Sequence, residues 1–163
     1  SAEQQTADWE AIKATERAEK AKQGTLDDVA LALPALMRAI KLQKRAARVG
    51  FDWPAIDQVL DKMIEEAQEL NEARDQLTQN DVQEEFGDLL FVMVNFGRHL
   101  KIDAEEALRL ANAKFTRRFK YIERALAKQG KTPMQSNLEE MDQLWDRAKA
   151  YDKAGHAAHS DQS

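Results

Sequence analysis

The sequence has no cysteine, which excludes a disulfide framework and a thiolate metal centre. It also has no basic excess, because its net charge is -5. This argues against a nucleic-acid polymer as partner, since such proteins neutralise phosphates with Lys and Arg. The longest apolar run, LLFVMV at 89–94, is far too short to span a bilayer. With a polar N-terminus unlike a signal peptide, these features predict a cytoplasmic protein without a membrane partner.

Glycine and proline are scarce, at 6 and 3 of 163 residues, so we expect long helices with few interruptions. Apolar residues recur with helical periodicity, and no stretch alternates as a strand does. Short connections between the third, fourth and fifth helices predict an antiparallel, all-α helical bundle. The expected helices cover 8–23, 34–50, 54–78, 80–100, 103–129 and 137–153, and residues 154–163 are expected to form a disordered tail.

Polar residues mark the expected helix starts. Asn80 and Asp81 are candidates to cap the fourth helix. Asp103 can cap the fifth, and Asn137 with Glu140 resembles a capping box for the last. These signals place the acidic clusters of the sequence on the third and fourth helices.

The stretch KMIEEAQEL, residues 62–70, gathers acids on the third helix. Successive helical residues rotate by about 100°, which places Glu66 at the edge of an apolar stripe and Glu69 on the same side. Lys62 falls between these two acids, whereas Glu65 and Glu72 point further out. Glu66 and Glu69 therefore share a face close to the expected core.

The fourth helix carries a second acidic pair, Glu85 and Asp88, beside an apolar stripe. Burying a carboxylate without a partner costs several kcal/mol, so four acids that converge between two helices call for a cation. Oxygen ligands without Cys or His favour Mg²⁺ or Mn²⁺. The alternative is a solvated acidic face, which is common on helices. The stripe consists of Val82, Phe86, Leu89, Met93, Phe96 and Leu100.

The order EExxE at 65–69 and ExxD at 85–88 resembles the signature of the all-α nucleoside triphosphate pyrophosphohydrolases. The stretches ALPALMRAIKLQKRAARVGFDW, EEFGDLLFVMVNFGRHL and ANAKFTRRFKYIE are similar to the MazG family, in particular to the C-terminal domain of two-domain members. The resemblance implies a catalytic helical domain at 51–153, with an N-terminal helical extension or linker at 1–50. A naturally single-domain protein is the alternative.

The resemblance also implies a hydrolase that cleaves a nucleoside triphosphate between the α- and β-phosphates, with Mg²⁺, or Mn²⁺, as cofactor. The products are the monophosphate and pyrophosphate, and the role is removal of unusual or surplus nucleotides. Asp81 stands where relatives often have a basic residue, so one phosphate contact of the family stays open. By motif position, the metal ligands are Glu66, Glu69, Glu85 and Asp88, and the nucleotide contacts are Lys62, Lys114, Arg118 and Trp145.

The residue chemistry agrees with these roles. Glu65, beside the metal pair, is our hypothesis for the catalytic residue that orients or deprotonates the attacking water. Lys114 and Arg118 share a helix face by i, i+4 spacing, whereas Arg117 is rotated away. A Trp such as Trp145 can stack on a base with about 1–3 kcal/mol. The alternatives are a solvated basic face and a packing tryptophan.

The apolar breadth of the fourth helix exceeds what one short bundle needs, so we expect a homodimer or higher homo-oligomer. Two alternative functions stay open. One is a single-substrate relative, such as a dCTP, dUTP or phosphoribosyl-ATP pyrophosphohydrolase. The other is a catalytically weak dimerisation or regulatory module.

Overall fold

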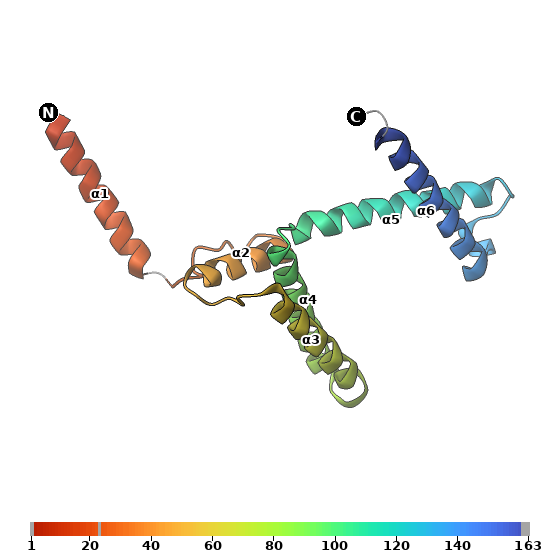
Figure 1. Ribbon diagram of the computed structural model, residues 1–163, viewed down its shortest axis with the longest axis horizontal. Helices are drawn as coiled ribbons and strands as arrows, with labels where there is room; N and C mark the ends of the chain where they lie inside the picture. Colours follow the sequence, from red (N-terminus) through yellow and green to blue (C-terminus); the bar gives the residue numbers. More distant parts are fainter. Residues whose placement is uncertain (1, 23, 161–163) are drawn as a thin grey trace. The chain divides into compact units, whose positions relative to one another are not determined.

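The computed structural model describes residues 2–22 and 24–160, which form helices and connecting loops (Figure 1). No strand occurs in these ranges, so the prediction of an all-α fold is confirmed. None of the described helices is long and apolar enough to cross a membrane. The elements are α1 (Ala2–Lys22), α2 (Ala35–Arg48), α3 (Ile56–Gln76), α4 (Gln79–His99), α5 (Ala104–Ala127), the 3-10 helix η1 (Pro133–Gln135) and α6 (Leu138–Ser160).

The observed bounds of α2 to α5 agree with the predicted ranges to within a few residues. The two terminal helices are longer than expected, since α1 begins at Ala2 and α6 continues to Ser160. Residues 154–160 are therefore helical where the sequence suggests a disordered tail, and residues 161–163 lie outside the described residues. The sequence also gives no sign of η1, which lies in an expected loop.

The cap of α4 differs from the prediction. The helix starts one residue before Asn80, and its N-cap is Thr78. The Thr78 hydroxyl accepts from the Asp81 N–H at 3.4 Å, and the Asp81 carboxylate accepts from the Thr78 N–H at 2.9 Å. This capping box satisfies two backbone N–H groups at the start of the helix. The Asp81 carboxylate is therefore used in the cap of α4. A basic side chain at this position could not accept the hydrogen bond from the Thr78 N–H.

The start of α6 agrees with the prediction in part. The Asn137 side chain accepts from the Glu140 N–H at 2.9 Å, as expected of a cap. The Glu140 carboxylate, however, accepts from the Ser136 hydroxyl at 2.6 Å and contacts the Lys131 ammonium at 3.3 Å. Glu140 therefore ties the preceding loop to the helix.

The chain divides into two compact units, Ser1–Glu105 and Glu106–Ser163. In the first unit, α3 and α4 pack together as an antiparallel pair joined by a short turn, and α2 packs on α4 (Figure 1). In the second unit, a small core of Ile122, Leu126 and Leu144 joins α5 to α6. The boundary falls inside the range 51–153, and a single catalytic domain over that range stays a prediction.

The predicted apolar stripe of α4 is buried only in part: Val82, Leu89 and Phe96 are half-buried, whereas the other three members are exposed. Phe86 and Met93, both in the predicted buried stripe, are 51% and 50% exposed. The buried residues of α4 are instead Val92, Val94 and Asn95. The reason is rotational: Phe86 lies about 160° from Asp88 around the helix, and Asp88 faces α3. Since α3 packs on the side that carries Asp88, the Phe86 side is left open.

Candidate metal and nucleotide site

Three carboxylates from two helices meet in the first unit. Glu66 of α3 and Glu85 and Asp88 of α4 each offer one oxygen, and these oxygens lie within 4.8 Å of one another. The i, i+3 spacing of Glu85 and Asp88 puts both on the side of α4 that faces α3. We call these three residues the acid cluster. The sequence predicts this convergence, because the α3–α4 turn is short enough to make the two helices antiparallel neighbours.

Glu66 is more deeply placed than the helical projection suggests. It lies on the buried line of α3 with Val59 and Ala73, seven residues away on either side. Its exposed fraction is 6%, so it is in the middle of the packed face and not at its edge. A carboxylate buried there requires a positive partner.

The acids of the cluster repel one another. Burial and the negative charges of Glu69, Glu66, Asp88 and Glu84 raise the pKa of Glu85. Glu69 does not belong to the group within 4.8 Å, yet its charge acts on Glu85. Of the four predicted metal ligands, three are therefore together and the fourth is beside them.

Lys62 supplies the nearby positive charge. Its ammonium lies 2.7 Å from the Glu66 carboxylate and 3.2 Å from that of Glu65. The hydrogen bond to Glu66 and the one to Glu65 raise the pKa of Lys62. One ammonium between two of the acids leaves an excess of negative charge on the cluster. Lys62 thus lies beside the acids, as its i, i+4 spacing from Glu66 predicts.

The donor set fits a small divalent cation. Mg²⁺ binds oxygen at about 2.0–2.1 Å, so two ligands of one ion lie at most about 4.2 Å apart. The 4.8 Å limit of the acid cluster is only slightly wider, and closing it needs a small side-chain movement. The cluster contains carboxylate oxygens alone, which suits Mg²⁺ or Mn²⁺ better than zinc.

Glu65, the predicted water-handling residue, lies outside the cluster. Its side chain is 56% exposed and contacts the Lys62 ammonium. Glu69, in contrast to the buried Glu66, is exposed as well, and so is Glu72 beyond the stretch. The structure therefore agrees with the expectation that the acids of KMIEEAQEL point in different directions.

The second unit gathers the predicted basic and aromatic contacts. The guanidinium of Arg118 lies 5.5 Å from the centre of the Trp145 ring. Arg118 also donates to the Asp152 carboxylate at 2.8 Å, and Arg117 contacts the same carboxylate at 3.0 Å. These hydrogen bonds lower the pKa of Asp152 from 3.8 to about 2. Arg117 is thus less remote from Arg118 than the spacing suggests, because both long side chains reach Asp152.

The remaining predicted contacts of this unit are placed as follows. Lys114 is exposed on α5. Trp145 packs against the core of Ile122, Leu126 and Leu144, and its ring centre lies 5.3 Å from that of Phe115. Trp145 is therefore at least a packing residue, and Arg118 covers part of its ring.

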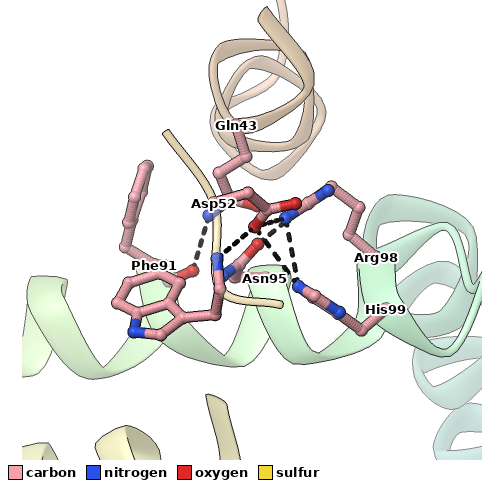
Figure 2. A network of polar contacts seen from close by, with 7 residues as sticks. Gln43, Asp52, Phe91, Asn95, Arg98 and His99 are labelled. Atoms are coloured by element: carbon pink, nitrogen blue, oxygen red, sulfur yellow. Dashed lines mark hydrogen bonds and ion pairs between the residues drawn. The ribbon is translucent and has the colours of Figure 1, made fainter. Parts of the chain in front are cut away.

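Sequence reasoning missed one polar network, between α2, residues 51–53 and α4 (Figure 2). The amide of Gln43 donates to the Phe91 carbonyl at 2.8 Å, and Arg98 donates to the Asn95 side chain at 2.9 Å. The Arg98 guanidinium also pairs with Asp52, and this hydrogen bond lowers the pKa of Asp52. Asn95 interrupts an otherwise apolar helix, which is the one signal of this network in the sequence.

Known proteins are similar to this chain over the residues that form the acid cluster. Residues 55–122 match the family described as the MazG nucleotide pyrophosphohydrolase domain. This match places a MazG domain in residues 55–122 of the chain. The matched range contains the acid cluster, Lys62 and Arg118, whereas Trp145 lies beyond it.

Two relatives extend the similarity over most of the chain. A protein of Escherichia coli K12 named nucleoside triphosphate pyrophosphohydrolase is 50% identical over 143 residues, which are 86% of this chain and 54% of that protein. A Thermotoga maritima protein named nucleoside triphosphate pyrophosphohydrolase/pyrophosphatase MazG is 41% identical over 145 residues, 89% of this chain and 55% of that protein. The chain thus spans about half the length of these relatives.

Proposed function

We propose that this chain is a nucleoside triphosphate pyrophosphohydrolase, which releases the monophosphate and pyrophosphate. The observation that carries the proposal is the convergence of Glu66, Glu85 and Asp88 within 4.8 Å. It occurs in a MazG domain whose relatives are named for that activity. The removal of unusual or surplus nucleotides, in the cytoplasm, is the role that the sequence predicts.

Mg²⁺, or Mn²⁺, is the proposed cofactor, held by Glu66, Glu85 and Asp88 with Glu69 beside them. When bound, the cation would offset the charge of the triphosphate and lower the pKa of an attacking water. The carboxylates fix its place because they project from two packed helices. Lys62, at 2.7 Å from Glu66, can turn from that acid toward a phosphate oxygen.

Glu65 is the proposed catalytic residue. It is exposed, close to Lys62 and one residue from Glu66, so its carboxylate can reach a water beside the cluster. Glu65→Gln keeps the size of the side chain and removes the base. We expect a fall in kcat of about 10²-fold or more, in the range of a lost general base. Full turnover by this variant would exclude the role.

Lys114, Arg118 and Trp145 are the proposed nucleotide contacts of the second unit. Arg is suited to bidentate phosphate contacts and Lys acts as a point charge. Arg118 already donates to Asp152, so a phosphate at Arg118 would share or displace that carboxylate.

The experiment that tests the function is product analysis. The chain is incubated with Mg²⁺ and a panel of ribo- and deoxyribonucleoside triphosphates, and the products are identified by ³¹P NMR. Pyrophosphate and monophosphate from many nucleotides are the expected result. Turnover of one nucleotide alone would favour the single-substrate alternative. Release of inorganic phosphate, or no turnover, would contradict the proposal.

A homodimer is the proposed assembly. Phe86, Leu90 and Met93 share one side of α4 and are 38–51% exposed, which is unusual for large apolar side chains that are only one or two turns apart. A second copy that covers this side would remove them from water. Sedimentation equilibrium tests the assembly. A dimer that Met93→Glu dissociates is expected, and a wild-type monomer would contradict it.

A further inference from the structure

Helix α2 carries a stripe of positive charge. Its sequence, ALMRAIKLQKRAAR, contains basic residues and no acid. Lys41, Lys44, Arg45 and Arg48 follow one another at i, i+3, i+4 and i+7, which is the spacing of one helix face. We call these four residues the cation stripe. Like charges four residues apart destabilise a helix, so an anion beside the stripe would relieve a repulsion that α2 contains.

The chain itself balances this charge only in part. Arg45 contacts the Asp28 carboxylate at 2.5 Å, whereas Lys41, Lys44 and Arg48 have no ion pair within residues 2–22 and 24–160. The helix dipole favours cations in the last turn, where Arg45 and Arg48 lie. Lys41 and Lys44 precede that turn. Their charges are therefore the ones that neither a partner nor the dipole offsets.

The cation stripe lines a pocket together with the segment before α2. The volume of the pocket is about 320 Å³, at the lower end of the range for small ligands. Its other walls come from Asp28, Val29, Ala30 and Leu33. Val29 is 5% exposed, and the ion pair of Asp28 with Arg45 ties this segment to α2. The fold thus holds the walls of the pocket in place.

Charge and size select the ligand. Four cations and one carboxylate line the pocket, which leaves a net charge of +3. A single phosphate group carries about -1.5 to -2 charges at pH 7, so two linked phosphates match the lining better than one. Lys and Arg are both suited to phosphate oxygens. A polynucleotide is too large for this volume, and the net charge of the chain, -5, also disfavours it.

The pocket is separate from the acid cluster, since the two share no residue. The centre of the cation stripe lies about 150° around α2 from Gln43, and Gln43 is the residue that donates to the Phe91 carbonyl of α4. Lys41 and Lys44 also line a second hollow with Lys101. The positive surface therefore continues beyond the pocket and leaves room for a second phosphate group.

We propose that this pocket binds an oligophosphate anion, with inorganic pyrophosphate as the ligand that fits it. Lys41, Lys44 and Arg48 supply the charge, and Asp28 holds Arg45 beside them. The site goes beyond the proposed function, because it lies outside the residues to which that function assigns the substrate. A bound anion stabilises the first unit, since it binds the folded state and α2 packs on α4.

Calorimetric titration with sodium pyrophosphate in EDTA tests the proposal. Without a divalent cation, the acid cluster stays negative and repels the anion. We expect the wild type to bind pyrophosphate at a single site, with an affinity that falls as the salt concentration rises. The double variant Lys44→Gln/Arg48→Gln should bind at least about tenfold more weakly, the range of a lost charge-assisted hydrogen bond. Pyrophosphate should also raise the Tm of the wild type and not that of the variant.

The matched control is Arg124→Gln/Lys128→Gln, at two exposed positions four residues apart at the end of α5. It removes the same charge at the same spacing and should bind pyrophosphate as the wild type does. No binding by the wild type, or an equal loss in the control, would overturn the site and leave a solvated basic face. Circular dichroism verifies folding, and if the double variant fails to fold, Lys44→Gln alone decides.

Two further anions identify the ligand. Orthophosphate should bind more weakly than pyrophosphate, and equal binding would overturn an oligophosphate site. ATP presents the other source of linked phosphates. Weaker binding of ATP than of pyrophosphate supports the free anion as the ligand, whereas tighter binding of ATP would overturn it and assign the pocket to a nucleotide.

The binding is measured without turnover, so it is tested separately from the proposed function. If the wild type hydrolyses triphosphates, Lys44→Gln/Arg48→Gln should keep the wild-type kcat and KM. A rise in KM as large as the loss of pyrophosphate affinity would place these cations in the substrate site and overturn the proposal. Pyrophosphate binding by a wild type that hydrolyses no triphosphate would contradict the function alone.

Discussion

The acid cluster and the contacts of Asp152 with Arg117 and Arg118, which we call the Asp152 pair, are both groups of charged side chains between two helices. Their charges are balanced differently. At the acid cluster, like charges face one another and the pKa of Glu85 is raised. At Asp152, one carboxylate lies between Arg117 and Arg118 and its pKa falls to about 2. The Asp152 pair is complete within the chain. In the described part of the chain, the ion pair that reaches the acid cluster is that of Lys62 with Glu66, and the cluster fits a cation from outside.

This difference distinguishes a charge cluster that stabilises the fold from one whose charges are suited to a ligand. Paired charges whose pKa values move toward the ionised state stabilise the fold that holds them. Facing carboxylates destabilise it, and such an arrangement is typical of a site prepared for a ligand. Four substitutions test it: two in the acid cluster, one at Asp152 and one at an exposed ion pair.

The largest effect is expected from Asp88→Asn, which keeps the side-chain size and removes one negative ligand. We expect pyrophosphate release to fall at least about 100-fold. The reason is that a metal contributes several kcal/mol to phosphate chemistry, and about 1.4 kcal/mol corresponds to tenfold in rate. Steady-state kinetics at saturating Mg²⁺ measures it. Glu72→Gln, at an exposed position on α3, is the control, and equal rates for both variants would contradict the metal role of Asp88.

Glu85→Gln should stabilise the metal-free protein at neutral pH. The raised pKa of Glu85 means that its protonated form favours the fold. That stability is present below the ordinary pKa of about 4.5 and is lost as pH rises through the raised value. Glutamine keeps a neutral side chain at every pH. Thermal melting in EDTA should give a higher Tm for the variant, and Mg²⁺ should raise the Tm of the wild type more. A lower Tm in EDTA would show that the acids do not repel.

Asp152→Asn should have the opposite sign in the second unit. The ionised carboxylate stabilises the fold above its ordinary pKa of 3.8, and that contribution is lost as pH falls toward about 2. The variant should therefore melt at a lower temperature at pH 7, and the difference from wild type should disappear near pH 2. Melting curves between pH 2 and pH 7 measure it. A constant difference over this range would contradict the pairing.

The smallest effect is expected at an exposed ion pair. Glu106 accepts from Arg109 at 2.7 Å, but both side chains are at least half exposed. Solvent screens such pairs and they contribute little. Glu106→Gln should leave the Tm within experimental error. A loss as large as that of Asp152→Asn would show that exposure does not separate the two pairs.

The sequence predicts the acid cluster better than it predicts the core around it. Motif spacing and a short turn suffice to bring Glu66 to Glu85 and Asp88, because helix rotation and antiparallel packing are both local properties. Which side of α4 is packed, by contrast, depends on residues that are distant in the sequence. Phe86 and Met93 look like core residues, yet their burial depends on which neighbour covers them, and α3 covers the side that carries Asp88.

The polar network around Gln43 could not be predicted for a related reason. Gln43 meets Phe91 across 48 positions of sequence, and no spacing rule joins residues that far apart. Asp52 and Arg98 meet in the same way. Asn95 alone gave a signal, as a polar residue inside an apolar helix. Long-range contacts of this kind can be identified only when the three-dimensional arrangement of the helices is known.

The most direct test of the central claim, that the acid cluster holds a divalent cation, is a titration with Mn²⁺ followed by electron paramagnetic resonance. We predict that the wild type removes the signal of free Mn²⁺ and that Mg²⁺ competes with it. Glu66→Gln and Asp88→Asn should weaken this binding by at least about tenfold. An undiminished signal of free Mn²⁺ with the wild type would contradict the claim. So would variants that bind Mn²⁺ as tightly as the wild type.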